Sequence, residues 1–323
     1  MTTFAHIMTA RIILFILPAL ILHAVPTRAC TSALVGRNRS ASGKMLLWKH
    51  RDTFSVQNFI ARGRGPVFDF VALFNAGDST LSEAWAGVNR AGFAVMNTAS
   101  YNLAPDTAAL RDREGLIMTL ALGSCATIGD FENMLDTLPR PLGVQANFGA
   151  MDRTGHGAYY ETDDNGYRKF PLTADSLLIR TNFSCSGQCG PGLGLERYDA
   201  ATTLIGHRCD ITPTLLTDTV SCSFHPHSGR NSYIDRGQYI PRYSTSASIV
   251  IDEDGHIWIK PGYPPLSPVT YRADIDSIPS SLLPDRLDGW HSPAWRTIEK
   301  TRNSHFRQTG DGTRIVTFIK PQL

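Results

Sequence analysis

Cys30-Thr-Ser-Ala-Leu-Val-Gly-Arg37 and Lys44-Met-Leu-Leu-Trp-Lys-His50 are two short apolar runs separated by a polar connection that contains glycine. Both runs have the length and composition of β-strands, and a short connection of this kind is typical of a hairpin loop. They therefore predict an antiparallel hairpin that begins at Cys30.

Further strand-like runs lie on both sides of a helical block. The block, residues 110–138, carries apolar residues at helical spacing and breaks near residues 123–126, which predicts two helices. Thr127 and Asp130 predict a capping box at the start of the second helix. Strands are expected at residues 54–61, 68–74, 83–86, 93–97, 144–151, 157–161, 177–181, 247–251, 256–260 and 313–319, and helices at residues 197–205 and 212–219. Runs of strands around a helical block indicate a layered α+β fold rather than a parallel doubly wound sheet.

The first 29 residues differ from the rest of the chain. Arg11 is followed by an apolar run at residues 12–22, and Ala29 stands directly before Cys30. This pattern predicts a secretory signal peptide at residues 1–29 and an exported, periplasmic or extracellular protein. The apolar run is far shorter than the roughly 20 residues of a membrane-spanning helix. A membrane anchor and a lipoprotein signal, which also ends before a cysteine, stay open as alternatives. No shift in composition divides residues 30–323, which we expect to form a single domain.

Charge and cysteine content limit the classes of partner. Without residues 1–29 the chain carries 29 Lys and Arg against 29 Asp and Glu. A neutral chain with no basic block argues against nucleic acid as a partner and against binding to an anionic membrane surface. The five cysteines other than Cys30 are an odd number, so at least one of them should stay a free thiol. Cys185 with Cys189, and Cys209 with Cys222, are the pairs close enough in sequence for a loop disulfide. The latter two lie near several histidines, but their spacing does not fit common zinc sites.

A cysteine exposed as the first residue by removal of a leader has a specific use in catalysis. The thiolate is the nucleophile, and an ordinary thiol with a pKa of about 8.5 needs a base near neutral pH. The α-amine has a pKa of about 7.7–8.0, so it can act as that base. Cys30 would then carry the nucleophile and the general base on one residue.

Several short motifs follow Cys30 in a fixed order. They are Cys30-Thr31, Trp48-Lys-His-Arg-Asp52, Gly87-Val-Asn-Arg-Ala-Gly-Phe93, Ala146-Asn-Phe-Gly149 with Asp152 and Glu161, Thr181-Asn182, and Glu196-Arg197-Tyr198. Over residues 30–265 the set resembles the linear-amide N-terminal-nucleophile (Ntn) hydrolase superfamily. It is most similar to the isopenicillin-N acyltransferase and carcinine hydrolase branch, and more distantly to choloylglycine hydrolase and penicillin V acylase.

The resemblance implies a four-layer αββα sandwich, two antiparallel sheets between helices, with the nucleophile at Cys30. It implies that Asp52 contacts the nucleophile and its amine, and that Arg197 neighbours the nucleophile and Asp52. Asn97 is the match for the asparagine of the oxyanion hole, with Asn102 as the alternative, and Asn182 supplies a second polar contact to the scissile amide. At the position of the first active-site cation this chain has Lys49, with Arg51 beside Asp52, so either could serve.

The sequence therefore predicts an exported cysteine amidohydrolase that cleaves a linear acyl amide through a Cys30 thioester. Its partner would be a small acyl amide, and neither a metal nor an organic cofactor is expected. Bile salts, penicillins, acyl-homoserine lactones and β-alanyl amines all stay open as substrates. Transfer of the acyl group to another amine is an alternative activity, and a non-catalytic secreted or lipid-anchored binding domain is the non-enzyme alternative. The superfamily often forms homo-oligomers, dimers or tetramers.

Overall fold

The structure of the chain is a computed structural model that describes residues 30–104, 112–188, 193–226, 232–308 and 314–317. The expected signal peptide at residues 1–29, and with it the expected exported state, lies outside the described residues. Within those ranges, no helix has the length and the apolar composition needed to cross a bilayer.

Two large antiparallel sheets form the centre of the molecule. The six-stranded sheet has the order β10-β1-β2-β12-β13-β14, and the seven-stranded sheet has the order β3-β4-β5-β6-β7-β8-β9. The first is made of β10 (Leu177–Arg180), β1 (Thr31–Val35), β2 (Leu46–Asp52), β12 (Thr245–Asp252), β13 (Ile257–Pro261) and β14 (Tyr271–Ala273). The second is made of β3 (Asn58–Arg64), β4 (Asp69–Asn75), β5 (Ala86–Asn89), β6 (Ala94–Ala99), β7 (Ala146–Met151), β8 (Gly157–Thr162) and β9 (Tyr167–Pro171).

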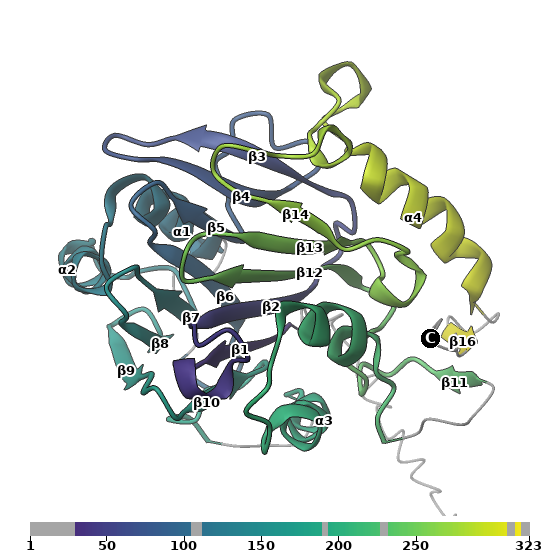
Figure 1. Ribbon diagram of the computed structural model, residues 1–323, viewed down its shortest axis with the longest axis horizontal. Coiled ribbons are helices and arrows are strands. Elements are labelled where there is room, and N and C mark those ends of the chain that lie inside the picture. Colours follow the sequence, from purple (N-terminus) through teal and green to yellow (C-terminus); the bar gives the residue numbers. More distant parts are fainter. Residues whose placement is uncertain (1–29, 105–111, 189–192, 227–231, 309–313, 318–323) are drawn as a thin grey trace, which may run out of the picture.

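Helices cover the outer faces of both sheets, as the expected αββα layering requires. On the seven-stranded sheet, α1 (Glu114–Ser124) packs against β4, β5 and β6, and α2 (Ile128–Thr137) packs against α1. On the six-stranded sheet, α3 (Leu195–Ile205) packs against β10, and a π-helical segment (Leu215–Thr219) packs against β12 and β13. The two sheets face each other, with β1 and β2 in contact with β6 (Figure 1). The fold class predicted from the sequence is therefore the one observed.

Successive side chains on a strand point to opposite faces of its sheet, and those that point between the two sheets form the main core. Leu34 and Leu47 belong to this core on the six-stranded side, and Tyr159, whose hydroxyl lies 2.8 Å from that of Ser32, reaches it from the other sheet. The neighbours on the same strands, such as Trp48, point outward into a second core under α3. β1 and β2 thus each have one face toward each core, so their charged side chains lie in one of two buried environments.

Predictions that depend on residues close together in the sequence are confirmed. β1 and β2 form the expected antiparallel hairpin, with Thr31 opposite His50. The helical block divides into α1 and α2, and Thr127 with Asp130 forms the capping box at the start of α2.

Other expectations need correction. The strand expected at residues 83–86 lies further along the chain, since Gly87, Val88 and Asn89 belong to β5. The proline-rich tail contains α4 (Pro293–His305), which was not predicted. A small third sheet joins β11 (Ser232–Ile234) and β15 (Phe306–Gln308), also not predicted, to β16 (Arg314–Thr317), which lies within the strand expected at residues 313–319. Cys209 and Cys222 are both free thiols, one exposed and one buried, so the disulfide considered between them does not form. Cys189 lies outside the described residues.

Candidate active site

Cys30 stands directly before β1 and is 7% exposed. It shares the inward face of β1 with Ser32, whose hydroxyl lies 2.8 Å from the Tyr159 hydroxyl of the opposing sheet. Arg197 holds the backbone at this point, because its Nη1 donates to the Cys30 carbonyl at 2.5 Å and to the Thr31 hydroxyl at 3.0 Å. The cysteine thus sits on a strand that a buried guanidinium fixes in place.

A cavity of about 140 Å³ opens beside Cys30 between the two sheets. Its volume is close to that of a cavity that holds one benzene molecule. Most of the residues that line it are polar. It consists of Cys30, Lys49, Arg51, Asp52, Thr53, Phe54, Ser55, Asn75, Trp85, Asn97, Ala99, Asp112 and Glu114. Three of the five predicted site residues, Cys30, Asp52 and Asn97, therefore meet at one cavity.

Lys49 and Arg51 both line the cavity, since residues two apart on β2 share a face. They lie 5.7 Å and 4.7 Å from the centre of the Trp85 ring. The pKa of Lys49 is lowered to about 7, chiefly by burial; Arg51 adds to this shift, whereas Cys30 and Asp112 oppose it. The structure therefore brings both candidates for the first active-site cation to the site.

Asn97 reaches the cavity from β6 of the opposing sheet. Its Oδ1 accepts a hydrogen bond from Lys49 Nζ at 2.6 Å. The alternative, Asn102, has another function in the fold. Its amide nitrogen donates to the carbonyls of Ser184 and Gln188 and so holds the loop that follows β10. Of the two asparagines, Asn97 is the one that lines the cavity beside Cys30.

The backbone of Asp52 lies beside Cys30, whereas its carboxylate points to the side of the second core. Cys30 Sγ lies 3.8 Å from the Asp52 carbonyl oxygen. The carboxylate accepts from Arg242 Nε at 2.7 Å and from the Thr245 hydroxyl at 2.6 Å. His50 lies 3.1 Å from the same Thr245 hydroxyl, and burial lowers the pKa of His50 to about 4. The histidine is therefore neutral at physiological pH, and the carboxylate is neutralised by Arg242.

Asn182 supports Arg197 from behind the nucleophile. Arg197 Nη2 donates to Asn182 Oδ1 at 2.7 Å, and Asn182 Nδ2 donates to the Ala99 carbonyl at 2.9 Å. Asn182 is buried and does not line the cavity. An oxyanion role would need its other N–H, and that role stays a prediction. Burial and the nearby Arg242 lower the pKa of Arg197 to about 9, which leaves the guanidinium charged at neutral pH.

Sequence reasoning missed two groups at this site, Arg242 and Trp85. Arg242 comes from a segment rich in His, Ser, Gly and Arg that reads as loop, and nothing local marks it as the partner of Asp52. Trp85 directly precedes β5, and only the fold shows that its ring lies beside two cations. Glu161, known from its motif, lies elsewhere. It binds Arg180 at 2.7 Å and the backbone nitrogens of Cys185 and Ser186.

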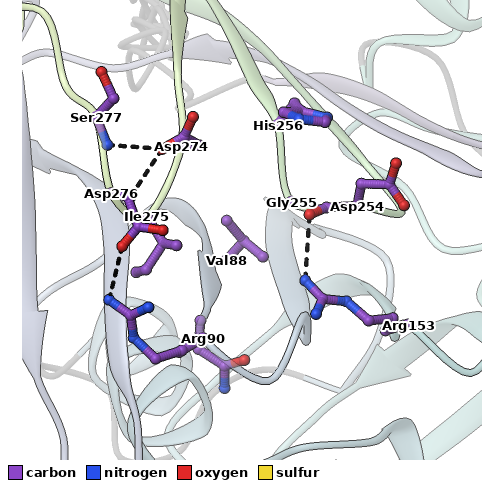
Figure 2. Close-up of a pocket in the computed structure, with 11 residues that line it drawn as sticks. Val88, Arg90, Arg153, Asp254, Gly255, His256, Asp274, Ile275, Asp276 and Ser277 are labelled. Carbon is purple, nitrogen blue, oxygen red and sulfur yellow. Dashed lines mark hydrogen bonds and ion pairs between the residues drawn. The ribbon is translucent and has the colours of Figure 1, made fainter.

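A second cavity, of about 370 Å³, lies at the other end of the sheets. β12 runs from Thr245 at the Cys30 end to Asp252, and the turn after Asp252 borders this second cavity. Figure 2 shows Arg90 pointing to Asp276 and Arg153 pointing to the turn at Gly255, each joined by a dashed line. The distances are 3.0 Å from Arg90 Nη2 to Asp276 Oδ1 and 3.3 Å from Arg153 Nη2 to the Asp254 carbonyl.

One group in the described part of the chain has the spacing of metal ligands, namely Asp252, Asp254 and His256. The Asp252 carboxylate already accepts from the backbone nitrogens of Asp254 and His256 and lies 3.1 Å from the His256 ring. Asp152 makes the corresponding bonds to residues 154 and 156 in the turn after β7. The arrangement is thus a repeated turn motif, and we assign no metal to it.

No family model matches the sequence, and no curated protein matches it. Solved structures do match. The chain is similar to an N-acylethanolamine-hydrolyzing acid amidase ortholog of Caenorhabditis elegans at 14% identity and a TM-score of 0.47, over 69% of this chain and 93% of that one. It is similar to penicillin V acylase of Agrobacterium tumefaciens at 14% identity and a TM-score of 0.48, over 77% and 87%. It is also similar to a conjugated bile acid hydrolase of Clostridium perfringens at 9% identity and a TM-score of 0.47, over 77% and 94%.

Penicillin V acylase and bile acid hydrolase are also among the proteins that the sequence motifs resemble. At these identities and TM-scores, what the chain does has to be argued from its own residues.

Proposed function

We propose that the chain is a cysteine amidohydrolase that cleaves a linear acyl amide through a thioester on Cys30. The reactive form begins at Cys30, after removal of residues 1–29, so that the α-amine of Cys30 is free. The observation that carries the proposal is the meeting of two buried side chains, Cys30 and Asn97, at one cavity, from two facing sheets. A thiol nucleophile and an amide donor on opposite walls are the parts that acyl transfer requires.

In the first half of the reaction, Cys30 Sγ attacks the substrate carbonyl carbon and its proton passes to the α-amine. The carbonyl oxygen gains negative charge, which the Asn97 N–H stabilises in the transition state. The C–N bond breaks, and the leaving amine takes the proton from the α-ammonium. An acyl-thioester and a free amine result.

In the second half, the α-amine takes a proton from a water molecule that attacks the thioester. The C–S bond breaks and the proton returns to the sulfur, which releases a carboxylic acid and restores Cys30. Arg197 fixes the nucleophile through the Cys30 carbonyl, and Asn182 and Asp52 act as its support. None of these steps needs a metal or an organic cofactor.

The first experiment is the intact mass and the N-terminal sequence of protein purified from the exported fraction. A mature chain that begins with an unmodified Cys30 is the expected result. A chain that begins elsewhere, or a Cys30 with an acylated amine, has no α-amine to act as base and would overturn the mechanism.

The second experiment incubates the mature protein with a panel of short-chain, long-chain and steroidal acyl amides and measures the released amine with fluorescamine. At least one amide should be cleaved, with a mass increase on Cys30 equal to the acyl group after an acid quench. Cys30→Ser should lose the thioester signal. Added amines test the alternative of acyl transfer, since a transferase would form a new amide in preference to the acid. Failure of the whole panel would favour a binding domain.

A further inference from the structure

Lys49 connects the two sheets at the candidate site. It rises from β2 of the six-stranded sheet and is 1% exposed. Its Nζ donates to Asn97 Oδ1 at 2.6 Å and to the Trp85 carbonyl at 2.8 Å, and both acceptors belong to the seven-stranded side. An ammonium carries three donors and no acceptor, so two of its N–H groups are directed across the gap between the sheets.

The contact determines which end of the Asn97 amide faces Lys49. The two ends are similar in shape, but the oxygen only accepts and the nitrogen only donates. Beside an ammonium the oxygen end is favoured, and the NH₂ end is left for the cavity that Asn97 lines. A flipped amide would set NH₂ against the ammonium and turn its carbonyl oxygen toward a developing oxyanion, and both contacts are repulsive.

We propose that Lys49 is a positioning residue that locks Asn97 with its NH₂ group turned toward the reacting carbonyl oxygen. This role rests on the proposed function, because it gives the Asn97 donor a task in acyl transfer. It also assigns separate tasks to the two cations of β2. Arg51 donates to Asn58, Asn75 and Ser246, and so fixes the cavity wall rather than Asn97.

Charge gives Lys49 one rival role. Burial lowers its pKa and Cys30 raises it, with Arg51, Asp52, Asp112 and Glu114 as the other charged groups at the cavity. A cation beside Cys30 could act directly on the thiolate instead of through Asn97. The two roles differ in what they affect. An oxyanion donor matters only for attack on a carbonyl, whereas thiolate stabilisation matters for every reaction of the sulfur.

A double-mutant cycle on an amide that the wild type cleaves tests the proposal. Lys49→Met and Asn97→Ala should each lower kcat by about 10²- to 10³-fold with little change in KM, the effect of losing an oxyanion donor. The kcat of the double variant should be at most about 3-fold lower than that of Asn97→Ala, because Lys49 acts through Asn97. Lys49→Arg, which keeps a donor, should recover part of the loss. Arg51→Met is the matched control, and its effect should multiply with that of Asn97→Ala.

Alkylation of Cys30 by iodoacetamide, followed by peptide mass spectrometry, provides the second measurement. Its rate should change by only a few-fold in Lys49→Met, since the sulfur displaces iodide from a CH₂ group and no oxyanion forms. A parallel fall in alkylation and amide cleavage, or a full Lys49→Met loss in the Asn97→Ala background, would overturn the proposal. The thermal midpoint of each variant separates these outcomes from misfolding. A wild type that alkylates normally but cleaves no amide would refute the proposed function itself, and with it the task given to Lys49.

Discussion

The two ends of the sheet sandwich hold similar charged groups in very different settings. At the Cys30 end, Lys49, Arg51 and Asp52 are each at most 2% exposed, around a cavity of about 140 Å³. At the turn end, Arg90 and Asp276 form an ion pair whose side chains are 56% and 75% exposed, around a cavity of about 370 Å³ (Figure 2). The larger cavity is therefore the one whose charges water can solvate.

Burial is what gives the smaller cavity its chemistry. An exposed ion pair is screened by solvent and contributes little to stability. A buried charge must be held by neighbours or shift its pKa, and Lys49 and His50 both show such shifts. Shifted pKa values together with a thiol and an amide donor mark a functional site, whereas volume alone does not.

The largest expected effect concerns the difference between a buried thiol at the cavity and a buried thiol outside it. Cys30→Ala should lower kcat/KM for amide cleavage by about 10⁴-fold or more, because the nucleophile is lost. Cys222→Ala, a matched change at a buried thiol outside the cavity, should leave kcat/KM within a few-fold. Steady-state kinetics on the purified mature chain measures both. Equal losses in the two variants would mean that Cys30 is a structural residue.

The next effect concerns the buried ion pair of Asp52. Arg242→Met should destabilise the fold by about 3–5 kcal/mol, because it leaves the Asp52 carboxylate buried without its cation. Urea denaturation at pH 7 measures the change. A loss below about 1 kcal/mol would show that water or another group reaches Asp52, and that the pair is no more buried than the one at the turn end.

The pair of Asp52 and Arg242 also shows which contacts the sequence could not predict, in contrast to the local elements. The β1–β2 hairpin and the break between α1 and α2 depend on neighbours in the chain, such as Thr127 and Asp130, so local patterns predicted them. Arg242 lies 190 residues from Asp52, and only the pairing of β12 with β2 brings the two together. No local pattern encodes a contact of that kind.

The C-terminal helix α4 was missed for a related reason. The proline-rich, polar tail reads as loop, although Pro293 at the first turn of a helix is a start signal. The reason for the helix is again distant. Trp295 donates to the Ser246 carbonyl and Arg302 to the Thr245 carbonyl, both at 2.6 Å, so α4 fixes the strand end that supplies Thr245 to Asp52.

A pH effect should distinguish buried from exposed histidine. The pKa of His50 falls from 6.5 in the unfolded chain to about 4 in the fold, chiefly through burial. Between these values the unfolded chain binds the extra proton, so stability falls as the pH drops from 6.5 toward 4, by up to about 1.4 kcal/mol per pH unit. His50→Gln should flatten this slope, and His156→Gln, at an exposed ring, should not. Urea midpoints at pH 4.5, 5.5 and 6.5 provide the comparison.

The smallest expected effect is at the turn end. Arg90→Met should change stability by about 1 kcal/mol or less, because both partners of its ion pair lie in solvent. It should also leave amide cleavage unchanged, since Arg90 lines the second cavity and not the one beside Cys30. Raising the salt concentration should abolish the small stability difference, as screening predicts for exposed charges. A large loss of activity in Arg90→Met would couple the two ends of the sandwich. The turn after β12 would then be the route to examine, because that strand begins at Thr245 beside Asp52 and ends at the second cavity.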